Sequence, residues 1–315
     1  MKRKILFINK AHPFLENHLQ SLGFDCELDT ESSKSEIEKK INQYFGVVIR
    51  SRFSIDKTFL KKAKKLAFVA REGVGTEHID LEYAAAKGIQ IITSPEGSSD
   101  AVGEHTIGLL LALMANLARG DRQIREGQWI REGNRAYEIK GKTVGILGYG
   151  NMGKAFAQRL TGFGAHVIAY DKFKTNYGDE NAEAVDLQAL FQESDILSLH
   201  IPFMPENHHF VNDTFLKNFS KEIYIVNTAR GLVLDTAALV QHLKNGKVRG
   251  AALDVLEYEE MSFEFLNFES LPKPFHYLQQ ADNVVLSPHI GGWSFESKEG
   301  HARVLAHKIE ERWKN

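Results

Sequence analysis

Residues 143–153 read TVGILGYGNMG, an apolar strand pattern followed by Gly148, Gly150 and Gly153 and then by a helical pattern. Gly148 allows a tight turn off the strand, and Gly150 lets the backbone approach a pyrophosphate closely. Gly153 lets the helix pack closely on the strand, and the N–H groups at the helix N-terminus face the anion. The stretch therefore predicts a dinucleotide-binding site.

A second strand pattern, VIAYD, ends in Asp171, which lies 18 residues after Gly153. A carboxylate at this place accepts hydrogen bonds from both ribose hydroxyls and repels a 2′-phosphate, which favours NAD over NADP. Lys172 and Lys174 follow directly, and a cation at either position could hold that phosphate. NAD is the predicted cofactor, with NADP as the alternative.

The bulk composition is that of an ordinary globular protein, with 43% hydrophobic and 25% charged residues. At 315 residues the chain should hold about two domains, each large enough for its own core. The 39 basic and 41 acidic residues give a net charge of −2. Because there is no basic excess, neither a nucleic acid nor an anionic membrane surface is an expected partner.

The cysteine content and the apolar segments indicate in which cellular compartment the protein is expected and whether a membrane segment is expected. Cys26 is the only cysteine, so no intrachain disulfide can form and no cysteine cluster can hold a metal. We expect no metal site, and a cytoplasmic location fits this cysteine usage. The N-terminal segment 1–10 predicts a first strand and not a signal peptide, because Asn9 and Lys10 end its apolar run. The apolar stretch 107–118 is too short to span a bilayer and predicts a buried helix.

Short apolar segments alternate with polar helical patterns through both halves of the chain. This alternation predicts parallel sheets covered by helices on both faces. We therefore expect an α/β fold of two doubly wound parallel-sheet domains, one flavodoxin-like and one Rossmann, with a cleft between them. The predicted strands are 5–9, 24–28, 46–51, 66–72 and 89–94 in the first half, and 143–148, 166–171, 195–202, 222–229, 248–255 and 283–289 in the second.

The segment 99–120 lies between the two halves, and the pattern predicts a final helix over 296–314. We expect this helix to pack back on the N-terminal half, which would make the first domain discontinuous. The predicted domains are a substrate-binding domain, 1–98 plus 293–315, and an NAD-binding Rossmann domain, 99–292.

Four ionisable side chains follow predicted strands of the second half, where ligands bind in open α/β sheets. Arg230 follows EIYIVNTA, Asp254 ends VRGAALD, Glu259 lies five residues further on, and His289 follows NVVLSP. Arg230 can fork onto a carboxylate and polarise the neighbouring C2 oxygen of a 2-hydroxy acid. His289 can take the hydroxyl proton as hydride leaves C2, and return it in the reverse reaction.

The two acids have different predicted tasks. Glu259 can accept a hydrogen bond from the other ring nitrogen of His289, which fixes the tautomer and favours the imidazolium. Asp254 is expected to bind the cofactor by holding its nicotinamide carboxamide. The arrangement predicts the oxidation of a small 2-hydroxy acid, or the reverse reduction.

The combination GYGNMG…VIAYD…VNTARG…AALDV…SPHIGG resembles the D-2-hydroxyacid dehydrogenase family, in which the phosphoglycerate dehydrogenases of serine biosynthesis form one branch. The resemblance covers nearly the whole chain, including AREGVGTEHID at 70–80 and SSDAVGEHTIGLLLAL at 98–113. It implies an active site in a cleft between two domains, a homodimer through the cofactor domain, and NAD as cofactor. Arg230, Glu259 and His289 match the family's catalytic residues.

The remaining binding residues are predicted from the same motifs. In the first half, Val74 and Gly75 lie in a glycine loop whose backbone amides could hold the substrate carboxylate. Arg50, Ser51 and Arg52 look like the substrate-phosphate site of phosphoglycerate dehydrogenases, with solvated surface arginines as the alternative. The predicted cofactor-binding residues are Val102, Gly148, Gly150, Asn151, Met152, Gly153, Asp171, His200, Thr228, Ala229, Asp254, Gly291 and Gly292.

Some positions depart from the family pattern. Glu260 stands where a proline usually follows the catalytic acid, and Glu257 offers a competing carboxylate. Two threonines that often follow the strand 195–202 are Met204 and Asn207 here, and Trp293 stands where phosphoglycerate members often have a serine.

Two segments keep more than one interpretation. Residues 121–142 are charged and contain Trp129; they fit either an arm that packs on a second subunit or a solvated helix. The aromatic-rich stretch 261–278 fits a lid, a subunit contact or a substrate wall.

The sequence therefore predicts an NAD-dependent D-2-hydroxyacid dehydrogenase, with 3-phosphoglycerate as the leading substrate. A glyoxylate or hydroxypyruvate reductase is the alternative that differs only in substrate. A non-catalytic NAD(H)-responsive protein, like the corepressors that share this family fold, is the alternative from another class.

Overall fold

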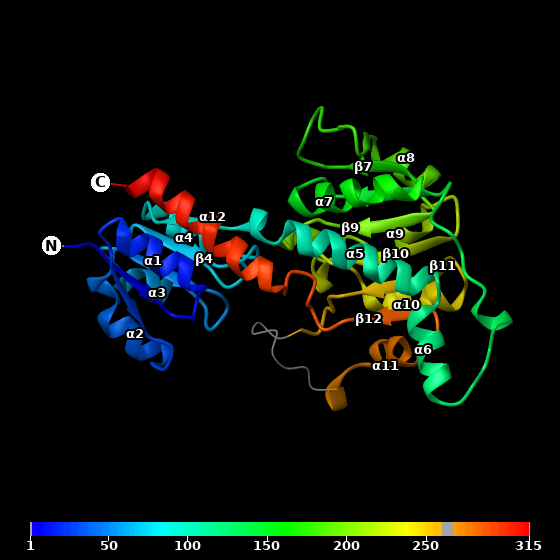
Figure 1. The fold of residues 1–315 in the computed structure, drawn as a ribbon, viewed down its shortest axis with the longest axis horizontal. Helices are drawn as coiled ribbons and strands as arrows, with labels where there is room; N and C mark the ends of the chain where they lie inside the picture. The colour runs from blue at the N-terminus through cyan, green and yellow to red at the C-terminus, as the bar shows by residue number, and fades with distance from the viewer. Residues whose placement is uncertain (1, 260–267, 315) are drawn as a thin grey trace. The chain divides into compact units, whose positions relative to one another are not determined.

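The computed structural model describes residues 2–259 and 268–314 (Figure 1). The chain forms two compact units, and one of them is discontinuous in sequence. Unit 1 consists of Met1–Ser98 and Trp293–Asn315, and unit 2 consists of Ser99–Gly292. Each unit has an open parallel sheet at its centre, so the predicted α/β class with two doubly wound sheets is confirmed.

Unit 1 contains a five-stranded sheet in the order β2-β1-β3-β4-β5. This is the flavodoxin-like order, in which strand order reverses between β1 and β3. All of its strands pair in parallel, as expected for strands that are joined by helices. The strands are β1 (Lys4–Phe7), β2 (Asp25–Leu28), β3 (Gly46–Ile49), β4 (Phe68–Arg71) and β5 (Gln90–Thr93).

Helices cover both faces of this sheet and bury two hydrophobic clusters against it. On one face, α1 and α12 bury Leu15, Leu19 and Leu305 against the strands, and the two helices lie side by side in Figure 1. On the other face, α2, α3 and α4 bury side chains such as Ile37 and Phe59. The helices are α1 (Pro13–Ser21), α2 (Lys34–Lys40), α3 (Lys57–Lys62), α4 (Leu81–Ala86) and α12 (Phe295–Trp313).

Unit 2 contains a seven-stranded parallel sheet in the order β12-β11-β10-β9-β6-β7-β8. Counted from β6, this is the Rossmann order 3-2-1-4-5-6 with one further strand, and the order reverses between β6 and β9. The sequence patterns missed β8, because two residues carry too little periodicity to be recognised. The strands are β6 (Thr143–Leu147), β7 (His166–Tyr170), β8 (Glu183–Ala184), β9 (Ile196–Leu199), β10 (Ile223–Asn227), β11 (Val248–Leu253) and β12 (Val284–Leu286).

Helices α5 and α7 cover one face of the second sheet, where Leu110, Phe156 and Leu160 are buried. Helices α8, α9, α10 and α11 cover the other face and bury Leu190, Phe215 and other apolar side chains. The helices are α5 (Ser99–Met114), α6 (Leu117–Arg125), α7 (Asn151–Leu160), α8 (Leu187–Glu193), α9 (Asp213–Lys217), α10 (Thr236–Lys244) and α11 (Lys273–Gln280).

The apolar stretch 107–118 is not one continuous helix. The chain breaks at Asn116, whose φ of 53° lies in the left-handed region, and α6 continues at 61° to α5. Asparagine tolerates this conformation better than most residues, so it can end a helix without glycine. No single helix among the described residues is long and apolar enough to cross a membrane, whereas the bent pair α5 and α6 passes by length and composition alone.

The aromatic-rich stretch 261–278 is described from residue 268 onward, and 261–267 lie outside the described residues. Its second part enters α11, which starts after Pro272. Phe275 and Leu278 are each 1% exposed, and Leu278 belongs to the hydrophobic core of unit 2. Phe275 and Leu278 therefore anchor α11 in the core, and the three roles considered above stay predictions.

Candidate active site

The glycine turn after β6 lies where the strand order of the second sheet reverses. A Cβ atom at Gly148, which has a φ of +95°, would lie 2.8 Å from the carbonyl oxygen of His200. One at Gly153 would lie 2.2 Å from the carbonyl oxygen of Gly148, whereas nothing lies within 4 Å of a Cβ at Gly150. The first and third glycines are thus required by packing, and the second leaves open space. This is the arrangement that a pyrophosphate needs, so the turn fits a dinucleotide.

Asp171 is held beside this turn by two backbone N–H groups. Its Oδ2 accepts from the N–H of Tyr149 at 2.9 Å, and its Oδ1 accepts from the N–H of Phe173 at 3.0 Å. Lys174 donates from Nζ to the carbonyl oxygen of Tyr149 at 2.7 Å, so its ammonium is engaged with the turn. The carboxylate is therefore fixed where the sequence places the ribose hydroxyls of a dinucleotide.

Glu259 and His289 are brought together at the carboxyl ends of β11 and β12. His289 Nδ1 lies 2.6 Å from Glu259 Oε2, and the two side chains are 24% and 18% exposed. The other carboxylate oxygen of Glu259 accepts from the N–H of Leu256, so the acid is held by its own loop. A carboxylate bonded to Nδ1 makes that nitrogen the donor and stabilises the imidazolium.

Glu257, the competing carboxylate, points elsewhere. Its Oε2 accepts from both the backbone N–H and the hydroxyl of Thr236, each at 2.9 Å, at the start of α10. His209 Nε2 lies 3.4 Å from the same oxygen. Glu257 therefore stabilises the N-terminus of a helix, and Glu259 is the acid at the histidine.

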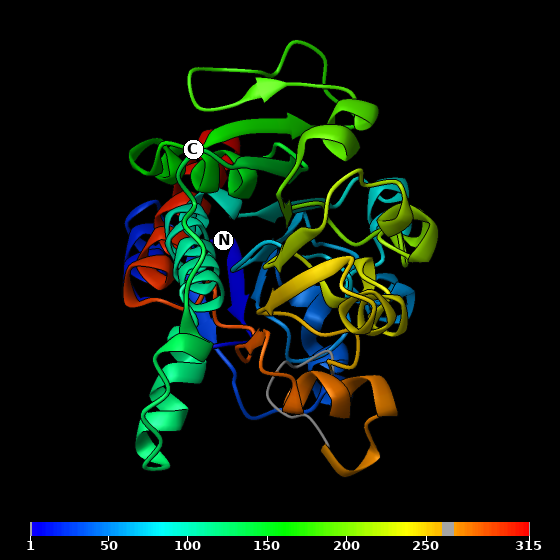
Figure 2. The same ribbon diagram turned by 90° about the vertical axis from the view of Figure 1, so that its right-hand side faces the viewer.

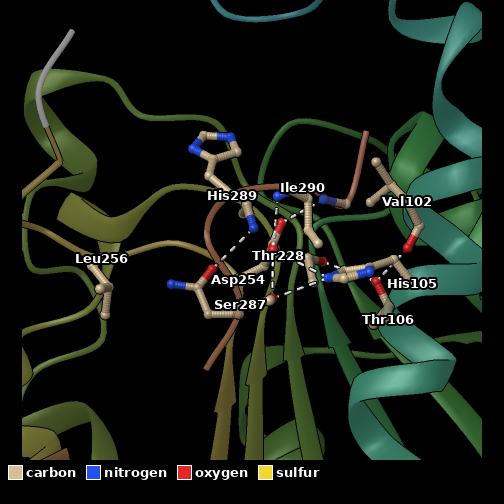
Figure 3. Close-up of polar contacts among 12 residues, drawn as sticks. Val102, His105, Thr106, Thr228, Asp254, Leu256, Ser287, His289 and Ile290 are labelled. Atoms are coloured by element: carbon tan, nitrogen blue, oxygen red, sulfur yellow. Dashed lines mark hydrogen bonds and ion pairs between the residues drawn. The ribbon is translucent and has the colours of Figure 1, made fainter. Parts of the chain in front are cut away.

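The Asp254 carboxylate holds the loop that carries His289, and its contact with the nicotinamide carboxamide stays a prediction. Figure 3 shows its carboxylate at the centre of a group of donors. Oδ1 accepts from the N–H of Ile290 at 2.9 Å and from the hydroxyl of Ser287 at 2.6 Å, and Oδ2 accepts from the N–H of Gly291 at 2.8 Å. His105 Nε2 lies 3.1 Å from Oδ1. The side chain is 2% exposed, and it holds the loop that carries His289.

The hydrogen bonds to Asp254 outweigh its burial. Desolvation alone would raise the pKa of a carboxyl group, yet donors from His105, Ser287 and the loop backbone lower the pKa of Asp254 to about 2. The group is therefore ionised over the whole range in which the protein is expected to work.

Arg230 lies directly after β10, and its Nη1 donates to the carbonyl oxygen of Ala229 at 2.7 Å. The side chain of Asn227 braces this turn, because it accepts from the N–H of Ala229 and donates to the carbonyl oxygen of Arg230. A Cβ at Gly231 would lie 2.0 Å from the carbonyl carbon of Leu256, so the Arg230 turn packs directly on the loop of Glu259. The guanidinium and the Glu259–His289 pair thus come from adjacent strand ends.

His200, a predicted cofactor residue, has a buried side chain, so its contact with the cofactor stays a prediction. Its ring packs against Phe156 with 5.5 Å between centroids, and its Nε2 lies 2.8 Å from the hydroxyl of Ser198. Burial lowers the pKa of His200 to about 3, so the ring is a neutral core group. Its backbone carbonyl oxygen packs against the glycine turn, 2.8 Å from a Cβ built at Gly148.

The other predicted cofactor residues of unit 2 lie at strand ends or helix starts. Thr228 and Ala229 follow β10, and the Thr228 hydroxyl lies 3.0 Å from that of Thr106 in α5. Val102 is a buried residue of the same helix, and its carbonyl oxygen accepts from the Thr106 hydroxyl. Asn151 and Met152 form the first turn of α7, and Gly291 and Gly292 follow His289.

In unit 1, Arg52, a predicted phosphate ligand, is hydrogen-bonded within the protein. Its guanidinium donates to three backbone carbonyl oxygens, those of Ile8, Asp29 and Ser32, at 2.6–3.1 Å. Three of the five N–H donors of the guanidinium thus tie together loops of the sheet edge and are not available to an anion. The sequence could not show this, because the carbonyls come from segments 20 to 44 residues away.

Arg50 takes a different position, with its guanidinium 4.2 Å from the centre of the Trp293 ring. Glu72 of the same unit is buried, with an exposed fraction of 4%. Burial raises the pKa of Glu72, although Arg50, Lys298 and Arg71 oppose the rise. Ser51 lies between the two arginines and is half-buried.

The glycine loop of unit 1 has a cation packed on it that the sequence analysis missed. Gly73 has a φ of +140°, and a Cβ there would fall 1.2 Å from Nη1 of Arg71. The Arg71 guanidinium therefore fills the place of a side chain at Gly73 and lies against the loop that contains Val74 and Gly75. A charged last residue of a buried strand was the available signal, since it implies a partner or a ligand.

Three comparisons with known proteins agree on one family. Residues 107–291 match the family model described as "D-isomer specific 2-hydroxyacid dehydrogenase, NAD binding domain". A glyoxylate reductase of Thermofilum pendens is 35% identical over 98% of this chain and 91% of its own length. A D-3-phosphoglycerate dehydrogenase of Archaeoglobus fulgidus is 32% identical over 95% of this chain, but this match covers 56% of that protein.

Among solved structures, the D-lactate dehydrogenase of Aquifex aeolicus, complexed with NAD and lactic acid, superposes with a TM-score of 0.83. It is 26% identical, and the match covers 98% of this chain and 95% of that one. The likeness thus spans both units.

Proposed function

The chain belongs to the D-isomer-specific 2-hydroxyacid dehydrogenase family and is an NAD-dependent oxidoreductase, and from this premise we propose that Arg230, Glu259 and His289 interconvert a small D-2-hydroxy acid and its 2-oxo acid. The observation that carries the proposal is the 2.6 Å contact between His289 Nδ1 and Glu259 Oε2 at the carboxyl edge of a Rossmann sheet.

His289 is the proposed acid and base. With Nδ1 donating to Glu259, Nε2 is the nitrogen that exchanges a proton with the C2 oxygen of the acid. Bound NAD supplies the hydride acceptor, and NADH the donor. During reduction the imidazolium gives its proton to the new alkoxide, and during oxidation the neutral ring removes it. Glu259 stabilises the charged ring in both directions.

Arg230 is the proposed carboxylate ligand. Its planar guanidinium suits a bidentate contact with a carboxylate, and the same charge polarises the C2 oxygen. The braced turn between Asn227 and Gly231 limits the directions that this side chain can take.

The glycine turn and Asp171 are the proposed NAD contacts. The open space at Gly150 admits the pyrophosphate, and the α7 N-terminus offers N–H groups to it. The Asp171 carboxylate favours ribose hydroxyls over a 2′-phosphate, and Lys174 is engaged with the carbonyl of Tyr149. Both features favour NAD over NADP.

For the substrate we propose a 2-oxo acid without a phosphate group, of the glyoxylate or hydroxypyruvate type. Of the two arginines that suggested 3-phosphoglycerate, Arg52 is committed to backbone carbonyls, and Arg50 is stacked on Trp293 beside the buried Glu72. A glyoxylate reductase of Thermofilum pendens, 35% identical over 98% of this chain, also supports this substrate class.

The test is the oxidation of NADH with glyoxylate, hydroxypyruvate and 3-phosphohydroxypyruvate, followed at the NADH absorbance. We expect the highest kcat/KM with one of the two unphosphorylated acids. A preference for 3-phosphohydroxypyruvate that disappears in Arg50→Ala would contradict the substrate proposal and restore the phosphate site. NADH binding without turnover of any of the three would favour a cofactor-responsive binding protein instead.

We also propose that the working form is a homodimer assembled through α6 and the segment after it. In Figure 2 these residues extend away from the sheet of unit 2. Their large apolar side chains are strongly exposed: Leu117 at 59%, Ile124 at 52%, Trp129 at 80%, Ile130 at 43% and Tyr137 at 52%. An exposed apolar surface of this kind suits a second copy. Sedimentation of wild type and Trp129→Glu tests it: a dimer that persists in both would refute the assignment.

A further inference from the structure

The loop that carries His289 has an unfavourable backbone conformation. His289 has a φ of 53°, in the left-handed region that residues with a Cβ rarely adopt. Such a residue persists only where its surroundings hold it. The direction of the imidazole depends on this backbone, so whatever holds the loop also aims the ring.

The holding group is the Asp254 carboxylate. It accepts from the N–H groups of the two residues after His289, at 2.9 and 2.8 Å, and the N–H of His289 donates to the Asp254 carbonyl oxygen at 2.8 Å. In Figure 3 the His289 ring points away from this carboxylate, while its backbone lies against it. Asp254 thus acts on the loop and not on the ring.

His105 is the group that orients this carboxylate from outside the loop. It lies in α5, and its Nε2 is 3.1 Å from Asp254 Oδ1 and 3.1 Å from the Ser287 hydroxyl. A Cβ at Gly291 would lie 3.3 Å from Cδ2 of His105, so the ring also packs on the loop backbone. The next residue of α5, Thr106, contacts Thr228 beside Arg230, which anchors the helix to the same sheet edge.

We propose that His105 is a positioning residue for His289: its Nε2–H fixes the Asp254 carboxylate, which holds loop 287–291 so that the His289 ring meets Glu259. The inference rests on the proposed catalytic role of His289. The low pKa of Asp254, to which His105 makes the largest favourable contribution, agrees with this arrangement.

A donor role and a packing role for His105 make different predictions. In His105→Gln the side-chain amide nitrogen can replace Nε2–H, whereas His105→Phe keeps a ring of similar shape and loses the donor. His166→Phe is the matched control, because His166 is an exposed histidine of unit 2 that lies 3.3 Å from Glu183.

The experiment measures kcat and KM for glyoxylate or hydroxypyruvate, NADH affinity by fluorescence, and thermal stability. We expect His105→Phe to lose at least about tenfold in kcat while NADH affinity stays within about twofold. His105→Gln should retain most of the activity, and His166→Phe all of it.

Two results would overturn the inference. One is wild-type kcat in His105→Phe. The other is an equal loss of activity and thermal stability in His105→Gln and His105→Phe, which would mean a packing role. His289→Ala distinguishes a failure of the proposed function from a failure of the positioning role. If His289→Ala keeps its activity, the proposed function is refuted. If His289→Ala is inactive while His105→Phe is unaffected, only the positioning role is refuted.

Discussion

Units 1 and 2 share an architecture, but different chemical groups line the carboxyl edges of their two sheets. Each has an open parallel sheet with helices on both faces. At the carboxyl edge of unit 2, glycines bring backbone N–H groups to the surface, and carboxylates hold the loops. At the corresponding edge of unit 1, guanidinium groups surround one buried acid.

The difference explains why the sequence contains a recognisable motif for the ligand site of unit 2 and none for that of unit 1. A pyrophosphate needs close backbone approach, which only glycine allows, so its site leaves a fixed pattern of spacing. A small carboxylate can be bound by any cation that reaches it, so its site leaves no such pattern. Matched substitutions in the two units can test this difference.

The largest expected effect concerns the acid–base pair of unit 2. His289→Ala should lower kcat by roughly 10² to 10⁴, the usual contribution of a positioned general acid or base. NADH binding, measured by fluorescence, should remain, because the contacts proposed for the dinucleotide lie at the glycine turn and Asp171. His166→Ala, at an exposed histidine of the same unit, is the control. A variant with near-normal kcat would show that unit 2 binds cofactor but does not carry the proton transfer.

The glycines of unit 2 should separate stability from binding. In Gly153→Ala the new methyl group meets the backbone oxygen of Gly148 at 2.2 Å, so we expect a loss of about 1–3 kcal/mol in unfolding free energy. In Gly150→Ala the methyl group meets nothing within 4 Å, so stability should be kept while NADH affinity falls. Thermal melts and NADH titrations of both variants test this. Equal melts, or unchanged affinity in Gly150→Ala, would contradict the roles given to the two positions.

Substitutions of Arg52 and Arg50 in unit 1 should likewise differ in their effect on stability. Arg52→Ala removes three hydrogen bonds to carbonyl oxygens, so it should lower the unfolding free energy by about 1–3 kcal/mol and leave KM unchanged. Arg50→Ala removes a guanidinium stacked on Trp293, so it should leave both the unfolding free energy and the KM for the unphosphorylated 2-oxo acid nearly unchanged. Denaturant titrations and steady-state kinetics test both variants, and a raised KM in Arg52→Ala would return Arg52 to the substrate site.

Most of the fold could be predicted because it rests on periodic burial. Strands such as Thr143–Leu147 and Ile223–Asn227 read as short apolar runs between helical patterns. The two-residue strand β8 has no period to detect, and the break at Asn116 depends on a single left-handed residue. Local conformations of this kind are set by the surrounding packing, which a sequence pattern does not contain.

The candidate site was predictable where topology fixes it. Glu259 and His289 follow adjacent parallel strands, so their meeting follows from strand order. The fate of a long, flexible cation does not follow from strand order. Arg52 and Arg71 are both near strand ends, yet one is tied to distant carbonyls and the other lies on a glycine loop. The hydrogen bonds of Asp254 to the loop of His289 did not follow from the sequence, because they depend on the course of the loop after β12.

The last contrast concerns the response of the two units to acid. In unit 1, burial lowers the pKa of His78 and of His301 to about 4, and in unit 2 it lowers the pKa of His200 to about 3. An unfolded histidine has a pKa of about 6.5, so below that pH the unfolded chain binds protons that the folded units do not. Stability therefore falls as pH drops from about 6.5 towards 4, by up to about 1.4 kcal/mol per pH unit for each histidine.

With two such groups against one, unit 1 should unfold first on acidification. Trp313, which stacks on Phe68 in unit 1, reports this by its fluorescence, since Trp129 of unit 2 is already 80% exposed. His78→Gln should move the Trp313 transition to lower pH, because one proton uptake is removed from unit 1. His200→Gln, the matched change in unit 2, should leave that transition in place. If both variants moved it equally, the two units would unfold as one cooperative body, and the contrast between them would be confined to their ligand edges.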